Sequence, residues 1–212
     1  MCAAIALNDD DVLVVVDMQQ DFCPGGNLPV HDGDEIVPLV NRLGRRFQNV
    51  VLTQDWHPEG HLSFASSYPD KNPYETIELP YGQQILWPDH CIQGTSGADF
   101  HPHLDIPAAT LVIRKGFRRA IDSYSAFFEN DRTTKTGLGG YLRERGLKRV
   151  FLAGLAFDFC VGYSAIDAVR EGFAALVIED ACRAIDVDDS LAATRASFLA
   201  HGVACFKSDL LG

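Results

Sequence analysis

The chain has 212 residues, enough to bury one substantial core, and 47% hydrophobic and 22% charged residues are proportions typical of a globular protein. Its formal net charge of −11 argues against nucleic acid or an anionic membrane as a partner, because both require a basic face. No apolar stretch approaches the roughly 20 residues of a membrane-spanning helix, and the first residues lack the basic-then-apolar order of a signal peptide. We therefore expect a cytoplasmic protein with no nucleic-acid or membrane partner.

Six cysteines are scattered along the chain without CxxC pairing. They are Cys2, Cys23, Cys91, Cys160, Cys182 and Cys205. A reducing compartment and a large core favour free thiols over disulfides. At least one of these thiols is therefore available for chemistry.

The first half of the chain begins with a strand and a helix. Val12–Val16 is short, β-branched and apolar on both faces, which predicts a buried parallel strand. His31–Phe47 has apolar residues at helical spacing, with acids early and arginines late, as the helix dipole favours. Asn49–Gln54 is the next predicted strand. Residues 55–109 are rich in proline, histidine and aromatic residues and lack regular periodicity, and so long a loop is usually functional.

The second half of the chain repeats the alternation of strand and helix. The further strands predicted are Thr110–Lys115, Arg149–Leu155, Ala174–Glu179 and Gly202–Phe206, and the helices are Leu138–Arg145, Cys160–Glu171 and Asp189–Ala200. This order predicts an α/β fold, a doubly wound, Rossmann-like and mostly parallel six-stranded sheet with helices on both faces. We expect a single domain over residues 1–212, with residues 55–109 forming a metal- and substrate-binding loop region.

Three complementary side chains stand at the predicted ends of strands. Asp17 follows the first strand, Lys115 ends another, and Cys160 follows Arg149–Leu155 after a tight turn. Ligands bind outside the carboxyl ends of parallel strands, so an acid, a base and a thiol are expected at one edge of the sheet. Each residue taken alone is more typical of a loop cap, a solvated strand end or a buried core thiol. Together they favour nucleophilic acyl transfer by an activated thiol.

A possible metal site follows the second predicted strand, in DWHPEGHLSF (Asp55–Phe64). Asp55 and His57 can supply a carboxylate oxygen and an imidazole nitrogen, and either His61 or His90 can supply a third ligand. Such a set suits zinc, iron or manganese. The alternative is that these are surface histidines of a loop.

Five segments, in order over nearly the whole chain, make the sequence resemble the nicotinamidase (pyrazinamidase) family of the isochorismatase-like hydrolases. They are VVDMQQDFCPGG (Val15–Gly26), TQDWHPEGHLSF (Thr53–Phe64), WPDHCIQGTSGADF (Trp87–Phe100), IRKGFRRAIDSYSAF (Ile113–Phe127) and GLAFDFCV (Gly154–Val161).

This resemblance implies a role for each matching residue. Cys160 would be the nucleophile, Asp17 the general base and Lys115 the third member of a triad. One divalent ion, zinc with iron or manganese as alternatives, would be held by the set Asp55, His57 and His90, with His61 ranked below them.

The resemblance also implies the pocket. Phe22 and Trp87 would enclose an aromatic ring, with Leu28 beside them. The backbone N–H groups of Ala156 and Cys160 would form an oxyanion hole, next to a cis peptide between Leu155 and Ala156. Two residues depart from many relatives, Gln20 and Phe157, and we expect Phe157 to reshape the pocket wall.

The implied activity is hydrolysis of nicotinamide to nicotinate and ammonia through a thioester, in NAD salvage, with pyrazinamide as a second substrate. One alternative is another small-amide hydrolase of the same superfamily, although members without a metal lack residues such as Asp55, His57 and His90. Another is a non-catalytic metal- or dinucleotide-binding module, which the absence of GxGxxG after the first strand disfavours. The sequence leaves open the metal, a homo-oligomeric state and the order of preference among amides.

Overall fold

A six-stranded parallel sheet forms the centre of the molecule, for which a computed structural model describes residues 4–212. Its strands are β1 (Asp11–Val16), β2 (Asn49–Asp55), β5 (Ala109–Lys115), β6 (Arg149–Leu155), β7 (Ala174–Arg183) and β8 (Ala204–Phe206). They lie in the order β5-β2-β1-β6-β7-β8, and every neighbouring pair is parallel. The six predicted strands and the doubly wound topology are confirmed.

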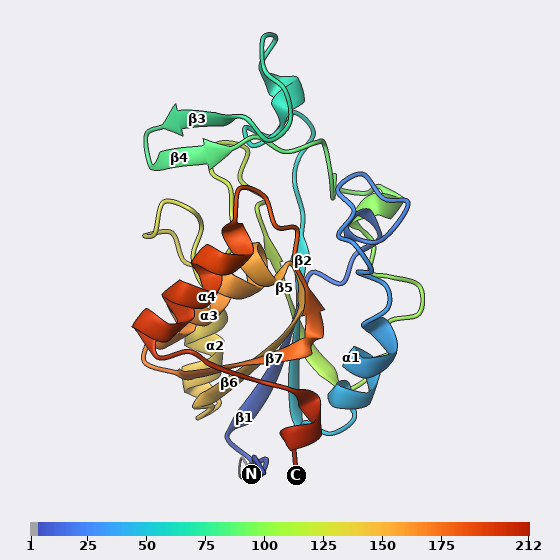
Figure 1. Cartoon of the computed structure of the whole chain (residues 1–212), viewed down its shortest axis with the longest axis vertical. Helices are drawn as coiled ribbons and strands as arrows, with labels where there is room; N and C mark the ends of the chain where they lie inside the picture. The colour runs from blue at the N-terminus through green and yellow to red at the C-terminus, as the bar shows by residue number, and fades with distance from the viewer. Residues whose placement is uncertain (1–3) are drawn as a thin grey trace.

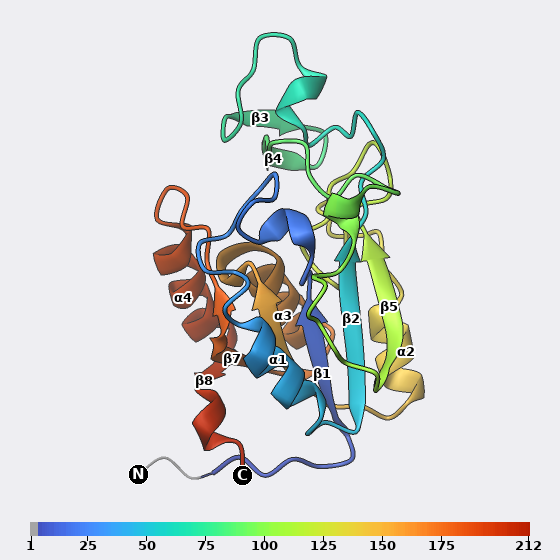
Figure 2. The same ribbon diagram turned by 90° about the vertical axis from the view of Figure 1, so that its right-hand side faces the viewer.

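Helices cover both faces of the sheet (Figures 1 and 2). The helix α1 (Val37–Gly44) lies on one face, and α2 (Leu138–Glu144), α3 (Gly162–Arg170) and α4 (Ser190–His201) lie on the other. From β1 the chain crosses to β2 on one side, and from β6 it crosses to β7 on the opposite side. The carboxyl ends of β1 and β6 therefore flank the topological switch point, where ligands bind in open α/β sheets.

The predicted helix over residues 31–47 is wrong in its extent. Residues 31–36 form successive turns, and Asp32 has a left-handed backbone with φ of 54°. Pro38 lies in the first turn of α1, where its fixed φ and missing N–H are tolerated. The helix is thus about half as long as the apolar spacing indicates, since proline starts it late.

The segment between β2 and β5 contains a hairpin that the sequence did not reveal. It consists of β3 (Thr76–Leu79) and β4 (Gly82–Ile85), which pair antiparallel and form a separate two-stranded sheet. The hairpin projects beyond the carboxyl end of the main sheet (Figure 1). Its strands have only four residues each and are partly exposed, so they carry no clear apolar alternation.

The two central strands are buried and make a close approach beside the switch point. All six residues of β1 are buried, and so are the last six of β6. Gly154 of β6 has φ of 119°, and a Cβ there would lie 2.1 Å from the carbonyl oxygen of Val16. Only glycine allows β6 to lie this close to β1, so the spacing of the two strand ends is fixed in the backbone. Within residues 4–212, no helix is long and apolar enough to cross a membrane.

Candidate active site

The acid, the base and the thiol predicted at strand ends meet at the carboxyl edge of the sheet. The Nζ atom of Lys115 lies 2.8 Å from Oδ2 of Asp17 and 3.5 Å from Sγ of Cys160. Asp17 and Lys115 are completely buried, and Cys160 is 7% exposed. The structure thus brings together three side chains that are separated by up to 143 positions in the sequence.

Neighbouring polar groups fix Asp17 and Lys115. The Thr53 hydroxyl donates to Oδ1 of Asp17 at 2.6 Å and accepts from its backbone N–H at 3.1 Å. Lys115 donates to the carbonyl oxygen of Ser123 at 3.0 Å. Burial alone would lower the pKa of Lys115, but the carboxylates of Asp17 and Asp55 outweigh burial and hold this pKa well above its usual range. Lys115 is therefore a permanent cation in the site.

The buried surroundings raise the pKa of both Asp17 and Cys160. Burial raises the pKa of Cys160 well above its usual range, and Lys115 offsets only part of this effect. Burial also raises the pKa of Asp17, again against the influence of Lys115, which makes the carboxylate a stronger base. The resting thiol is thus neutral and lies next to a basic carboxylate.

Cys160 lies in a π-helical turn, Phe157–Val161, immediately before α3. The prediction that the helix itself begins at Cys160 is therefore wrong by two residues. The Ala156 carbonyl accepts from the N–H groups of Phe159, at 3.1 Å, and Val161, at 3.0 Å. Such wide turns are frequent at functional sites. The Leu155–Ala156 peptide bond is cis, as predicted.

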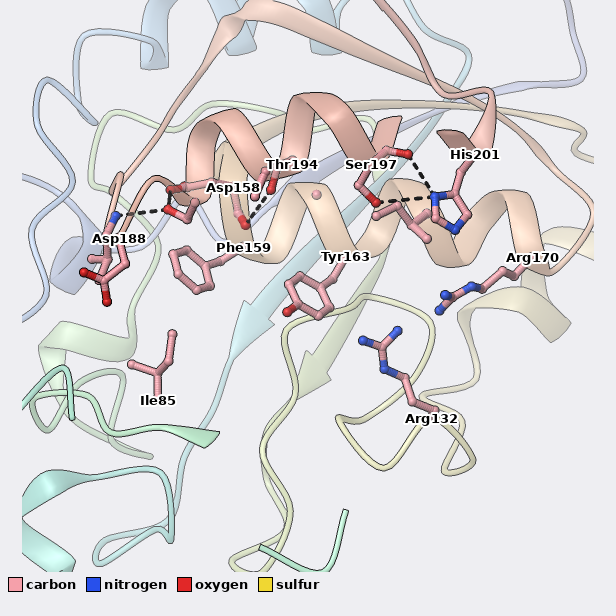
Figure 3. A pocket seen from close by; sticks show the side chains of 15 residues that line it. Ile85, Arg132, Asp158, Phe159, Tyr163, Arg170, Asp188, Thr194, Ser197 and His201 are labelled. Carbon is pink, nitrogen blue, oxygen red and sulfur yellow. Dashed lines mark hydrogen bonds between the residues drawn. The ribbon is translucent and has the colours of Figure 1, made fainter. Parts of the chain in front are cut away.

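Asp158 attaches this turn to the start of α4. Its carboxylate accepts from the N–H groups of Ile185, at 3.0 Å, and Asp186, at 2.7 Å, and from the hydroxyl of Ser190 at 2.6 Å. Its carbonyl oxygen accepts from the Thr194 hydroxyl at 3.1 Å (Figure 3). These bonds hold the backbone on both sides of Asp158, so they also fix the position of Cys160.

The prediction that Phe157 shapes the pocket wall is wrong. Its ring packs edge-on against Phe198 of α4, with centroids 5.4 Å apart, and the guanidinium of Arg195 lies over it. Phe159, two residues further along the same turn, lines the pocket instead. Phe157 therefore stabilises the contact between the turn and α4.

A second cluster lies beside the first, at the metal site expected from the sequence. One ligand atom each of Asp55, His57 and His90 lies within 4.8 Å of the others, and all three residues are buried. Oδ2 of Asp55 is 3.0 Å from Nε2 of His57 and 3.4 Å from Nε2 of His90. Asp55 also connects the clusters, because its Oδ1 lies 3.0 Å from Nζ of Lys115.

The other nitrogens of these two histidines define which atoms face Asp55. Nδ1 of His57 lies 2.9 Å from the carbonyl of Gly116, and Nδ1 of His90 lies 2.7 Å from that of Pro88. A carbonyl only accepts, so both Nδ1 atoms carry the proton and both Nε2 atoms can present a lone pair. A proton or a cation must then lie between them and Asp55. The carboxylate of Asp55 also raises the pKa of His57 against the effect of burial. Both observations show that the space beside Asp55 favours a positive charge.

This donor set fits a divalent transition metal. Two neutral imidazoles and one carboxylate suit zinc, iron or manganese, and backbone carbonyls behind both rings are the usual outer support of such ligands. The residues that would hold the ion are therefore Asp55, His57 and His90.

His61 lies next to this cluster, but its nitrogens are engaged elsewhere. Its ring centroid is 4.3 Å from that of His57. Nε2 faces the carbonyl of Arg118 at 3.0 Å, and Nδ1 faces the Ser63 hydroxyl at 2.7 Å. Its ring also belongs to a second possible ligand group with His57 and Asp122. In this arrangement His61 directs no free lone pair towards Asp55.

Two residues that support the cluster were missed in the sequence. The Gln19 amide bonds both backbone groups of Asp55, donating to its carbonyl at 2.8 Å and accepting from its N–H at 2.7 Å. Gly116 has φ of 65°, and a Cβ there would lie 2.5 Å from Cε1 of His57. Both residues stand beside predicted site residues, Gln19 near Asp17 and Gly116 after Lys115, and this proximity is the signal that could have identified them.

One pocket opens onto both clusters. Its lining includes the predicted ring-binding residues Phe22, Leu28 and Trp87, together with Ala156, Cys160, Asp55 and His90. It also includes four residues that sequence reasoning missed, Asp122, Tyr124, Phe159 and Ile185. The Trp87 indole donates to the Tyr124 hydroxyl at 3.0 Å and packs edge-on against Phe159 at 4.9 Å. The wall is therefore rigid and aromatic.

A larger and more open pocket lies on the other side of Phe159, between α3, α4 and β4 (Figure 3). Its lining includes Arg132, Tyr163, Arg170 and His201, but neither Cys160 nor any of the predicted metal ligands. We therefore assign the chemistry to the smaller pocket.

The fold and the site define a class of hydrolases with a doubly wound parallel sheet, in which a cysteine, an aspartate and a lysine meet at the switch point. Residues 11–205 match the isochorismatase domain family. The chain therefore belongs to the isochorismatase family.

Individual relatives agree with this assignment. The chain is 56% identical to a nicotinamidase of Acinetobacter baylyi over 90% of this chain and 89% of that protein. A solved nicotinamidase and pyrazinamidase structure from Acinetobacter baumanii superposes with a TM-score of 0.95 and 57% identity, covering 96% of this chain and 99% of that one. A pyrazinamidase of Pyrococcus horikoshii solved in complex with zinc superposes with a TM-score of 0.77 and 34% identity, covering 93% and 99%.

Proposed function

We propose that the protein is a nicotinamidase, which hydrolyses nicotinamide to nicotinate and ammonia and also accepts pyrazinamide. One observation carries the proposal: Cys160 and the metal-binding residues Asp55 and His90 line the same aromatic-walled pocket. Phe22 and Trp87 suit a planar ring, and a ring held there would present its carboxamide to the thiol. The similarity to nicotinamidases over most of the chain supports this substrate.

The metal ion would be held by Asp55, His57 and His90, and zinc is the ion we propose. When bound, it supplies a Lewis acid that orients a ring nitrogen and so positions the substrate. The nucleophile comes from the chain itself.

Catalysis would begin with proton transfer from the Cys160 thiol to Asp17. The sulfur then attacks the carboxamide carbon, forming the C–S bond while the carbonyl electron pair moves to oxygen. Backbone N–H groups of Ala156 and Cys160 would stabilise this oxyanion, a contribution of about 3–4 kcal/mol per donor in a protease case. Lys115 would keep the Asp17 carboxylate in place beside the sulfur.

The second half of the reaction would regenerate the thiol. Asp17 returns its proton to the amide nitrogen, the C–N bond breaks, and ammonia leaves a thioester on Cys160. Asp17 then takes a proton from a water molecule, which attacks the thioester carbon. The C–S bond breaks, Asp17 returns this proton to the sulfur, and the acid formed loses its proton to water as nicotinate leaves. One water is consumed for each ammonia produced. A place in NAD salvage follows from these products.

The test is ammonia release from nicotinamide, pyrazinamide and a panel of other small amides by zinc-loaded protein. We expect nicotinamide to be hydrolysed, and Cys160→Ala to lose more than about a thousandfold in rate while keeping its zinc. The matched control is Cys182→Ala, a buried cysteine outside the pocket, which should remain active. Hydrolysis of another amide but not of nicotinamide would favour a different member of the superfamily. Full activity of Cys160→Ala would exclude the thioester.

A further inference from the structure

Asp122 is a buried carboxylate with no cationic partner. It is 2% exposed, and within residues 4–212 no lysine, arginine or histidine nitrogen lies within 4.0 Å of its oxygens. Its hydrogen-bond donors are neutral amides, Nε2 of Gln84 at 2.7 Å and its neighbour's N–H, of Ser123, at 2.8 Å. A buried charge costs several kcal/mol unless an opposite charge compensates it. The position therefore calls for a cation nearby.

The pocket places Asp122 next to the metal-binding cluster. Asp122 lines the same pocket as Asp55 and His90. One of its oxygens lies within 4.8 Å of a ring nitrogen of His57 and of His61, beyond salt-bridge distance. The Asp122 carboxylate is thus too far from either ring for a direct hydrogen bond, and a water molecule could bridge it to a group at the cluster.

The sum of the buried charges in the site also calls for a cation. In the form that presents neutral imidazoles, the pocket region holds three buried carboxylates, Asp17, Asp55 and Asp122, and one buried ammonium, Lys115, which pairs with Asp17 and Asp55. Two negative charges remain. A divalent ion would balance them, whereas direct ligation by Asp55 alone would account for only one.

We propose that Asp122 is an outer-sphere carboxylate of the metal site, which attracts the divalent ion by its charge and contacts it through water. The inference deepens the proposed function, because it rests on the metal site described there. Asp122 acts on the ion without touching it, so it is a positioning residue, and its removal should weaken metal binding itself.

The experiment measures zinc affinity of the metal-stripped full-length protein by competition with a chromogenic chelator, without substrate. Asp122→Asn keeps an oxygen acceptor and removes the charge, and we expect zinc to bind about 10- to 100-fold more weakly. Asp11→Asn is the matched control. Asp11 is 1% exposed and lies at the opposite end of β1, where it pairs with Arg149. Its zinc affinity should equal that of the unmodified protein.

Two further variants separate the charge from a structural role. Asp122→Ser also removes the charge and should weaken zinc binding similarly. Gln84→Met removes the hydrogen bond from β4 but leaves the Asp122 charge, and it should bind zinc normally. Normal affinity in both neutral variants would overturn the inference. So would failure of both to fold, or an equal loss in Gln84→Met, because each would make Asp122 a structural residue.

The zinc titration tests the role of Asp122, and the ammonia assay tests the substrate, so either proposal can be rejected without the other. Weak zinc binding by Asp122→Asn in a protein that does not hydrolyse nicotinamide would support the inference and reject the substrate. Hydrolysis of nicotinamide with normal zinc binding by the variants would do the reverse.

Discussion

Lys115 is the residue on which the charge balance of the site depends. It is completely buried and lies within 3.0 Å of oxygens from both Asp17 and Asp55. Its raised pKa keeps the ammonium charged through the range in which proteins are usually studied. Without it, the Asp17 and Asp55 carboxylates would lose the one ammonium that pairs with both of them.

We therefore expect Lys115→Met to lower the free energy of unfolding by about 3–5 kcal/mol, as removal of one partner of a buried ion pair does, and to abolish ammonia release. Urea unfolding of the metal-stripped protein measures the first effect. Lys148→Met is the control, because Lys148 pairs with Asp10 at the surface and its side chain is 76% exposed. That change should cost at most about 1 kcal/mol. Equal costs for the two variants would show that the buried ammonium contributes no special stability.

At the scale of single residues, the sequence predicted the site residues that stand at the ends of strands. Asp17, Lys115 and Cys160 each follow or end an apolar run, so the parallel sheet dictates that they meet. The choice between His61 and His90 depends instead on the path of a loop. The His57 N–H donates to the carbonyl of Cys91, and this contact, between residues 34 positions apart, brings His90 next to Asp55. No local pattern encodes such a contact.

Among the elements, the end of β5 supports the metal site through its backbone. Lys115 closes the strand, and Gly116 then turns the chain with a left-handed φ of 65°. The Gly116 carbonyl holds Nδ1 of His57, and no space exists for a side chain between them. Two consecutive residues thus serve the site: Lys115 supplies the ion pair, and the Gly116 carbonyl positions His57, a proposed metal ligand.

Gly116→Ala should therefore displace His57 and reduce both bound zinc and ammonia release. The reason is steric, because the new Cβ would lie 2.5 Å from the ring. Gly146→Ala is a matched control, since Gly146 has a similar φ of 69° but nothing within 4 Å of its Cβ position. It should incur only the left-handed strain of about 1–2 kcal/mol and keep its zinc. Zinc per chain, measured after dialysis, distinguishes the two, and equal retention would contradict the steric argument.

The elements that the sequence predicted poorly are those without a strong period. The six strands of the sheet are apolar runs, and all of them were found. The β3–β4 hairpin was missed because its strands are short and partly exposed, and α1 was overextended because turns precede Pro38. Tertiary contacts define the hairpin, such as the bond from Gln84 of β4 to Asp122. The missed hairpin therefore supports the pocket wall, which explains why pocket residues were the least predictable part of the site.

At the scale of the whole molecule, the proposed metal ligands come together only when the chain folds. Asp55 ends β2, His57 follows it, and His90 belongs to the segment between β4 and β5. Their three ligand atoms lie within 4.8 Å of one another in the folded state alone. An ion that binds this arrangement and not the unfolded chain must stabilise the fold.

Zinc should consequently raise the melting temperature of the metal-stripped protein. At a free zinc concentration 100 times the dissociation constant, the stabilisation is about 2.7 kcal/mol, which for a chain of this size corresponds to about 5–10 °C. Differential scanning calorimetry across a zinc series measures the shift, which should grow with the logarithm of the zinc concentration. His57→Ala removes one ligand and should show little shift in the same series. A shift of equal size in that variant would mean that the stabilising ion binds elsewhere, and the three residues would lose their assignment as the metal site.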